Sequence, residues 1–549
     1  MSNMTVEGGF KLTADGKMYK KGKRIYPNKD EYEGEFVENL KHGNGVLRYA
    51  NNNKYTGEFK DDFPHGFGVY QYHTIDDKGR RVKYHKYEGN FQRGKRHGKG
   101  VYIAANGDTY TGEFENDLYH GEGLLVKVNG DRFEGDWERG KASGKTIDIS
   151  FGNGDKYNGG MRNGLFNGKG EFLWRRNTGS YKGEWWKGKA HGRGERIFIN
   201  GNKFTGSFSA GRMQGDGIMS YTNGDQYIGE WRSGHKHGKG VLRFANGDRY
   251  EGGFYSGIFY GYGKFTYSDG SYYEGEYLVL KKGADDAVGF PDPNGLRNGS
   301  GLRVWANGNR YEGSFRDDFV HGDGSLQKFE GGKYSGEFRN GERHGMGIEE
   351  FGNLIAENYV CPMGNKHKGE GYCIYNGQFA NNKFDGIGEF MCQDNRYYKG
   401  HWKGGKRHGR GVQSYLREGE AGDAKRLFIG GVGSLYRFRL FDGMWQNDVR
   451  EGHGVATYVN GDTIEGNFIS GRAHGIVKYT FASTGAVNHA MYCRGIRESF
   501  DSKESAKVLS NMALQFLMDD AAFTNTIASH TGVGNFGEMT RNYSKQPTL

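Results

Sequence analysis

A short pattern of residues recurs along this chain at a nearly fixed interval, and this interval constrains the fold more than any other feature. The pattern is an aromatic or apolar residue, any residue, Gly, any residue, and then Phe, Trp or Tyr. It starts at Tyr32, Tyr55, Tyr87, Tyr110, Phe133, Tyr157, Tyr181, Phe204, Tyr227, Tyr250, Tyr273, Tyr311, Tyr334, Tyr375, Tyr398, Phe441 and Ile464. Of the 16 intervals, ten are 23 residues, two are 24 and four are longer. A fixed period of this size indicates a repeat array.

One unit of the array predicts a β-hairpin. In Tyr227–Trp231, alternation places Tyr227, Gly229 and Trp231 on one face of a strand, and residues 240–244 alternate in the same way. An Asn-Gly pair such as Asn246-Gly247 separates successive units, and we expect both of its residues to have positive φ, as in a tight hairpin turn. The fold class is therefore all-β, an elongated single-layer antiparallel ribbon. The 15% of aromatic residues must supply its core.

The Tyr-x-Gly-Glu-Phe/Trp opening, followed by His-Gly-x-Gly and Asn-Gly-Asp, resembles the MORN repeat. The resemblance implies about 17 hairpin units over residues 32–495, after a lead-in or cap at 1–31, with one further degenerate unit at 355–371. Insertions interrupt the period near 71–86, 279–297 and 416–436. Residues 496–529 are expected to be a helical segment, and residues 530–549 a disordered tail.

Rings that repeat in register predict a trough that binds protein, in the way that other repeat arrays use their extended faces. The candidate residues are Tyr110, Phe114, Trp137, Tyr181, Trp185, Tyr227, Trp231, Tyr250 and Tyr311. The alternative for each ring is that it simply belongs to the core.

Catalytic, metal and cofactor sites are not expected. Histidines in successive hairpins stand about 10 Å apart by the strand spacing, too far to share a zinc ion. The four cysteines form no C-x-x-C pair, which argues against a zinc ribbon and against a disulfide-stapled secreted domain and fits a reducing cytosol. Gly140–Thr146 echoes a phosphate-binding loop, but Arg139 stands where that motif needs glycine. We therefore predict neither an enzyme, a cofactor nor a small-molecule substrate.

The net charge of +10 suggests a second surface. Bases gather in what we expect to be the long turn before each His-Gly pair, with Lys95, Arg96, Lys236, Lys406 and Arg407 as the candidate edge. Such an edge could bind anionic phospholipids or acidic partners. The alternative is a solvated edge that prevents strand pairing. No module typical of nucleic-acid binding is present, so nucleic acid is not an expected partner.

Near the C-terminus, residues 502–522 predict an amphipathic helix with Val508, Leu509, Met512 and Phe516 on one face. This helix either caps its own array or docks in a partner. No signal peptide or membrane-spanning run is apparent.

The resemblance to MORN proteins built almost wholly of repeats implies a cytoplasmic scaffold of the cytoskeleton. The expected setting is the axoneme of a cilium or flagellum, where radial-spoke-head components are of this kind, with other cytoskeletal proteins as partners and a homo-oligomer as a further option. The alternative is a linker between membrane and cytoskeleton.

Overall fold

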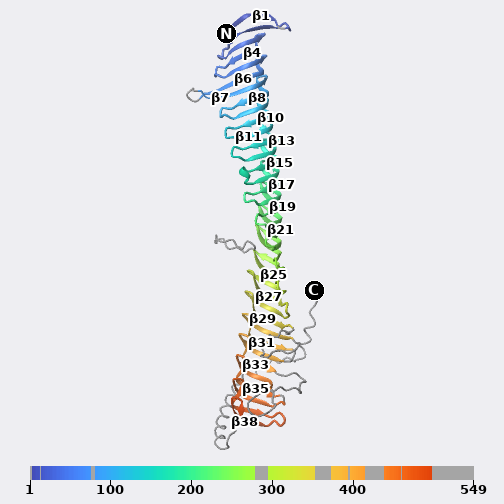
Figure 1. Cartoon of the computed structure of the whole chain (residues 1–549). Helices are drawn as coiled ribbons and strands as arrows, with labels where there is room; N and C mark the ends of the chain where they lie inside the picture. The colour runs from blue at the N-terminus through green and yellow to red at the C-terminus, as the bar shows by residue number, and fades with distance from the viewer. Residues whose placement is uncertain are drawn as a thin grey trace. The chain divides into compact units, whose positions relative to one another are not determined.

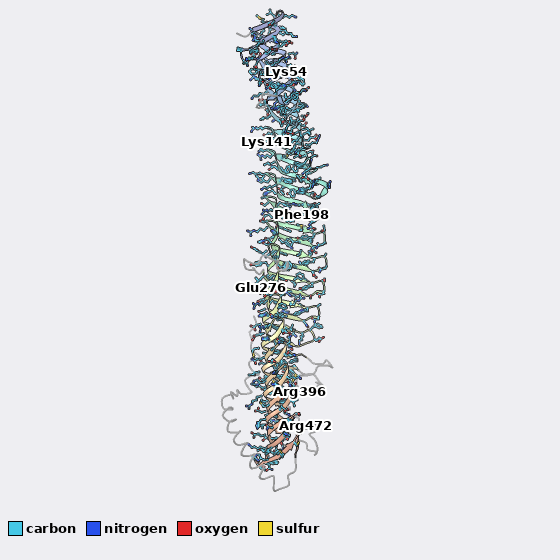
Figure 2. All side chains as sticks on the ribbon, turned by 90° about the vertical axis from the view of Figure 1, so that its left-hand side faces the viewer. Lys54, Lys141, Phe198, Glu276, Arg396 and Arg472 are labelled. Carbon is cyan, nitrogen blue, oxygen red and sulfur yellow. A yellow bond between two sulfur atoms is a disulfide. The ribbon has the colours of Figure 1, made fainter. Side chains whose placement is uncertain are left out.

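The computed structural model describes residues 3–12, 14–75, 81–278, 295–352, 372–392, 396–414, 438–458 and 460–497. The chain divides into two compact units, Met1–Phe329 and Glu330–Leu549. Within each unit, consecutive strands follow one another in chain order (Figure 1) and side chains project from the strands along their length (Figure 2). The described part contains one 3-10 turn, η1 (Arg175–Asn177), and no helix able to cross a membrane.

The first unit is an antiparallel succession of strands. These are β1 (Asn3–Leu12), β2 (Met18–Ile25), β3 (Glu31–Val37), β4 (Leu40–Arg48), β5 (Lys54–Lys60), β6 (Phe63–Ile75), β7 (Arg81–Gln92), β8 (Lys95–Ile103), β9 (Thr109–Glu115), β10 (Leu118–Val126), β11 (Arg132–Glu138), β12 (Lys141–Ala142), β13 (Gly144–Ser150), β14 (Lys156–Arg162), β15 (Leu165–Leu173), β16 (Ser180–Trp186), β17 (Lys189–Ile197), β18 (Lys203–Ser209), β19 (Arg212–Ser220), β20 (Gln226–Arg232), β21 (His235–Arg243), β22 (Arg249–Tyr255), β23 (Ile258–Thr266), β24 (Tyr272–Leu278), β25 (Leu296–Val304), β26 (Arg310–Arg316) and β27 (Phe319–Gln327).

The second unit has the same plan. Its strands are β28 (Lys333–Arg339), β29 (Glu342–Phe351), β30 (Cys373–Ala380), β31 (Lys383–Cys392), β32 (Tyr397–Lys403), β33 (Lys406–Ser414), β34 (Phe438–Gln446), β35 (Val449–Tyr458), β36 (Thr463–Ile469), β37 (Arg472–Thr480), β38 (Val487–Cys493) and β39 (Ile496–Arg497). The prediction of an all-β antiparallel fold is therefore confirmed. The expected helix with Val508, Leu509, Met512 and Phe516 lies outside the described residues, as do the degenerate unit and the tail.

Most hairpins of the repeats are shaped by a pair of glycines at their centre. In β20–β21, Gly229 lies opposite Gly240, and the Tyr227 ring folds over both. A Cβ on Gly229 would come within 2.5 Å of the Gly240 Cα, and a Cβ on Gly240 within 2.5 Å of the Tyr227 hydroxyl oxygen. The repeated glycines therefore give the ring a place against the backbone, which allows a single-layer sheet to bury its own core.

The two ends of a hairpin use different turns, and our expectation for Asn-Gly was wrong. In Asn246-Gly247 only the glycine has positive φ, at 94°. Positive φ at two successive residues occurs at the opposite end, where Ser233 and Gly234 have φ of 51° and 91°. The Asn-Gly turn is wider: the Phe244 N–H donates to the Asp248 carbonyl and the Gly247 N–H to the Phe244 carbonyl. This longer loop needs only one left-handed residue.

Three segments outside the regular period are also strands. The lead-in at 1–31 holds β1 and β2, and Gly22 pairs with Gly34 of β3, as glycines pair within the array. The insertion at 71–86 lengthens β6 and β7, whose pairing continues from Gln71–Lys86 to Ile75–Arg81. The second insertion ends in residues 296 and 297, which are the first two residues of β25. Its residues 279–294 and the whole third insertion lie outside the described residues.

Candidate interaction surface

The core is a column of aromatic rings that passes from one repeat to the next. The Tyr227 ring meets Trp231 of its own unit at 5.2 Å and Phe254 of the next unit at 4.9 Å, both edge to face. Edge-to-face contact is a favoured arrangement of aromatic pairs. Equivalent contacts recur in both units of the chain, for example where Tyr398 meets Trp402 and Trp445. Each repeat therefore completes the core of its neighbour.

The nine rings predicted to line a binding trough lie inside this column. Their exposed fractions run from 0% to 9% for Tyr110, Phe114, Trp137, Tyr181, Trp185, Tyr227, Trp231, Tyr250 and Tyr311. Their burial agrees with the alternative interpretation, that each ring belongs to the core. A partner on this face would meet the residues that cover the rings.

The polar atoms of the column are also used internally. The Tyr227 hydroxyl donates to the Glu230 carbonyl at 3.0 Å and to the His237 carbonyl at 3.4 Å, so the repeated histidine contributes its backbone to the core. The Trp231 indole N–H donates to the Gly217 carbonyl of the preceding unit. Burial raises the pKa of the Tyr181 phenol to about 12, so this hydroxyl stays a neutral donor at physiological pH.

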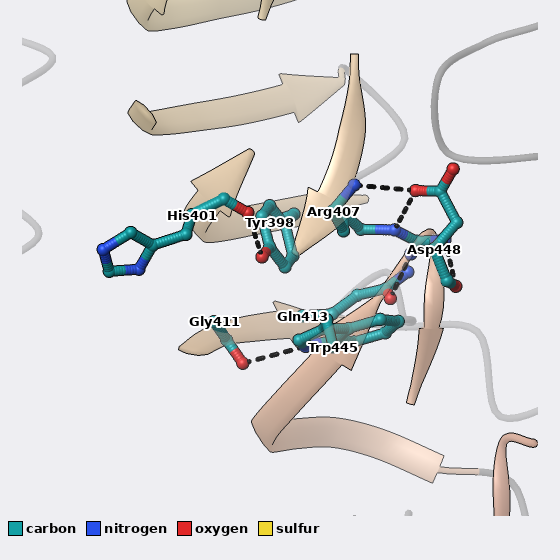
Figure 3. Close-up of polar contacts among 7 residues, drawn as sticks. All are labelled: Tyr398, His401, Arg407, Gly411, Gln413, Trp445 and Asp448. Carbon is teal, nitrogen blue, oxygen red and sulfur yellow. Dashed lines mark hydrogen bonds and ion pairs between the residues drawn. The ribbon is translucent and has the colours of Figure 1, made fainter. Parts of the chain in front are cut away.

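The second residue of the second strand of each hairpin lies beside the rings, and we call it the cap residue. In some units it is aromatic: Tyr119 stacks on Tyr110 with centroids 3.8 Å apart, and Phe384 stacks on Tyr375 at 3.7 Å. In others it is a cation, such as Arg407, whose guanidinium lies 4.5 Å from the Trp445 centroid (Figure 3). Its Nε lies 3.0 Å from the Asp448 carboxylate.

The predicted basic edge is divided by this arrangement. Lys95 and Lys406 are exposed at the starts of β8 and β33. Arg96, Lys236 and Arg407 are cap residues that turn inward, over the rings. The expectation of a long basic turn was wrong because the turn has only two residues, so the alternation of the following strand directs every second base into the core.

The acidic residues of the repeat have roles that the sequence reading missed. The Glu230 carboxylate accepts the Lys239 N–H at 2.9 Å, where the His-Gly bulge leaves this group without a ladder partner. In the Asn-Gly-Asp turn, Asp225 accepts the Ala245 N–H of the next turn at 2.8 Å. The constant spacing between this glutamate and the His-Gly pair could have predicted this contact. In repeats that contain both the glutamate and the His-Gly pair, the spacing places the carboxylate beside the bulge.

Two cysteines also form a pair that was not expected. Cys373 and Cys392 are direct cross-strand partners in β30–β31 and are joined by a disulfide. The absence of a C-x-x-C motif did not exclude this bond, since strand pairing brings together residues 19 positions apart. Among the described residues, no group of three or more potential metal ligands occurs.

These features define a class of protein. It is an open antiparallel sheet of repeated hairpins, in which the aromatic rings of each hairpin pack against those of the next hairpin. The chain belongs to the MORN-repeat family, since fifteen segments that together exceed half of its length match the MORN repeat. The matched residues are 32–54, 55–74, 87–109, 110–132, 133–145, 157–178, 181–203, 204–226, 227–249, 250–272, 294–310, 334–353, 375–395, 398–415 and 441–463. Such an array is a repeat scaffold for protein or membrane interactions.

Similarity to characterised proteins is partial. Alsin from Mus musculus and from Homo sapiens are each 33% identical to the chain over 132 residues, which cover 17% of this chain and 8% of Alsin. The chain thus spans less than a tenth of these relatives.

Among solved structures, the TCP domain of SAS-4 from Drosophila melanogaster aligns at 12% identity and a TM-score of 0.19, covering 32% of this chain and 86% of that domain. Virginiamycin B lyase from Staphylococcus aureus aligns at 10% identity and a TM-score of 0.10, covering 59% and 96%.

Proposed function

We propose that this chain is a non-catalytic scaffold of the cytoskeleton that holds other proteins along its repeats, as an axonemal component of the radial-spoke-head kind. The observation that carries the proposal is how the repeated side chains are used. The tyrosine hydroxyls, the Trp231 indole and the carboxylates of Glu230 and Asp225 all bond to the backbone of their own array. What varies from unit to unit is the cap residue and the outward side chains, as expected of a contact surface.

The membrane-linker alternative has less support. Attraction to anionic lipid is about 1 kcal/mol for each base that lies near the surface. Of the five candidate bases, Arg96 and Arg407 are paired with Asp117 and Asp448, and Lys236 is half-buried over two rings. Two exposed lysines, Lys95 and Lys406, give only a weak attraction.

A tagged full-length chain in ciliated or flagellated cells tests the proposal. We expect the chain to follow the axoneme and to stay with it after non-ionic detergent removes the membrane. The matched control is the same chain with Lys95→Glu and Lys406→Glu, which should be retained equally. Release of the wild-type chain with the membrane fraction would overturn the scaffold function in favour of the linker.

A further inference from the structure

The cap residue and the turn of the following repeat form a matched pair. In the equivalent positions of both units of the chain, the N–H of the second turn residue donates to the carbonyl of the cap residue; Gly257 donates to Lys236 in this way, and Asp448 to Arg407. The side chain at that turn position therefore always lies beside the cap side chain.

Cationic caps are usually matched by an acceptor side chain. Arg407 donates its backbone N–H to Asp448 Oδ1 at 2.9 Å and its Nε to the same oxygen at 3.0 Å (Figure 3). Lys41 does the same with Asp62: its backbone N–H lies 2.8 Å and its Nζ 3.2 Å from Oδ1. The remaining matched pairs are Arg96 with Asp117, Arg297 with Asp318 and Arg343 with Asn382.

Uncharged caps are matched by glycine instead. The pairs are Pro64 with Gly94, Tyr119 with Gly140, Ala142 with Gly164, Phe166 with Gly188, Ala190 with Gly211, Met213 with Gly234, Phe384 with Gly405 and Ala473 with Gly495. A turn carboxylate thus accompanies a cation and is absent where the cap is uncharged. The carboxylate serves to neutralise the cap.

Lys236 departs from this rule. The residue beside it is Gly257, where Lys41 has Asp62. Its Nζ lies 5.7 Å from the centroids of Tyr227 and Phe254, and in the described part of the chain it has no ion pair and its backbone N–H no side-chain acceptor. Burial lowers the pKa of this ammonium, with Asp225 opposing at longer range. Arg450 also faces a glycine, Gly471, with its guanidinium over Phe441 and Phe468.

We propose that the Lys236 ammonium and backbone N–H form a carboxylate-binding site that takes an Asp or Glu side chain from a partner protein. The partner's carboxylate would occupy the place that Asp62 holds beside Lys41, accepting from both donors. Charge complementarity selects an acidic residue, and the Lys236 ammonium lies half-buried over the Tyr227 and Phe254 rings, where partial desolvation strengthens an ion pair. The proposal rests on the scaffold function in one respect, because the acidic side chain comes from a protein that the scaffold binds.

The substitution Gly257→Asp tests the site without any partner, because it returns the matched carboxylate. Position 257 has φ of 95° and Asp117 occupies the equivalent place at φ of 73°, so the variant should fold. Nuclear magnetic resonance of dimethylated lysines in the full chain should show the pKa of Lys236 rising. An unchanged pKa in a folded variant would overturn the site.

The partner class is tested with a fluorescent peptide of alternating Glu and Gly residues, with both ends blocked, by anisotropy. We expect Lys236→Gln to weaken binding about fivefold, a change typical of one partly exposed ion pair. Gly257→Asp should weaken it similarly by filling the site from within. Lys239→Gln, which removes an exposed lysine three positions away, controls for net charge and should have less than about half that effect on the binding free energy.

Equal effects of Lys236→Gln and Lys239→Gln, or wild-type binding by Gly257→Asp, would overturn the partner class. Either result together with axonemal retention of the wild-type chain would leave the scaffold function standing. Loss of retention in the wild-type chain would instead count against the scaffold function.

Discussion

The pairing of Arg407 with Asp448 offers a sharp test of how neighbouring repeats hold together. Asp448→Gly removes the acceptor of two donors and leaves the Arg407 side chain, only 9% exposed, over Trp445. Losing hydrogen bonds to a charged group costs about 1.5–3 kcal/mol. Asp448 has a left-handed backbone conformation, with φ of 71°, and glycine adopts this conformation with less strain, which offsets roughly 1 kcal/mol of the lost stability. The net local destabilisation should be about 0.5–2 kcal/mol.

Two further variants make the expectation specific. Asp448→Asn should cost less than the glycine variant, because Asn382 accepts the Arg343 N–H at 3.0 Å in the same place. Combining Asp448→Gly with Arg407→Phe converts the pair to the other arrangement present in the chain, that of Phe384 with Gly405. The double variant should recover most of the lost stability.

Hydrogen exchange with mass spectrometry is the suitable assay, because repeat arrays open locally and need not unfold in two states. Amides of β33 and β34 should exchange about 2–30-fold faster in Asp448→Gly than in the wild-type chain, with β20–β21 as an unaffected control. If Asp448→Asn exchanges as fast as Asp448→Gly, or if the double variant is no better protected than the glycine variant, the matched-pair account is wrong.

Three other predictions concern the repeat itself. Tyr227→Phe should lower local stability by about 1 kcal/mol, since the Glu230 carbonyl loses its donor; equal protection of β20–β21 in both chains would refute this. Gly229→Ala should disrupt the same hairpin by more than about 4 kcal/mol, because the new Cβ meets the Gly240 backbone, and circular dichroism of a fully folded variant would contradict it. Backbone N–H donation from the next turn depresses the pKa of Asp108, so its stabilisation holds above about pH 4 and is lost as pH falls; Asp108→Asn should abolish this acid sensitivity of exchange, and an unchanged pH profile would speak against it.

The fold followed from the sequence because its constraint is local and repeated. The spacing of Tyr227, Gly229 and Trp231 placed them on one face, and the structure pairs Gly229 with Gly240 as alternation requires. The two-residue turn at Ser233-Gly234 was missed because the turn signal was read only from the Asn-Gly pairs between units, although Asn163-Gly164 and Asn340-Gly341 stand at the equivalent turn, with both residues at positive φ.

The candidate surface was harder to predict, because it depends on contacts between units. Arg407 and Asp448 are 41 residues apart, and their contact becomes apparent only when neighbouring hairpins are paired side by side in the sheet. A count of bases also could not separate the exposed Lys406 from the inward-facing Arg407, because that difference comes from the alternation of β33 after its two-residue turn. Cys373 and Cys392, by contrast, meet within one hairpin, through the register of β30 and β31.

The claim that this array serves protein contacts is tested most directly by one sedimentation measurement. Purified full-length chain is mixed at low salt either with axonemes stripped of their own copy or with vesicles of phosphatidylserine and phosphatidylcholine. We predict that it sediments with the axonemes, and that any vesicle binding is weak and disappears at physiological ionic strength, where exposed charges are screened within about 8 Å. Salt-resistant binding to the vesicles without binding to the axonemes would contradict the account.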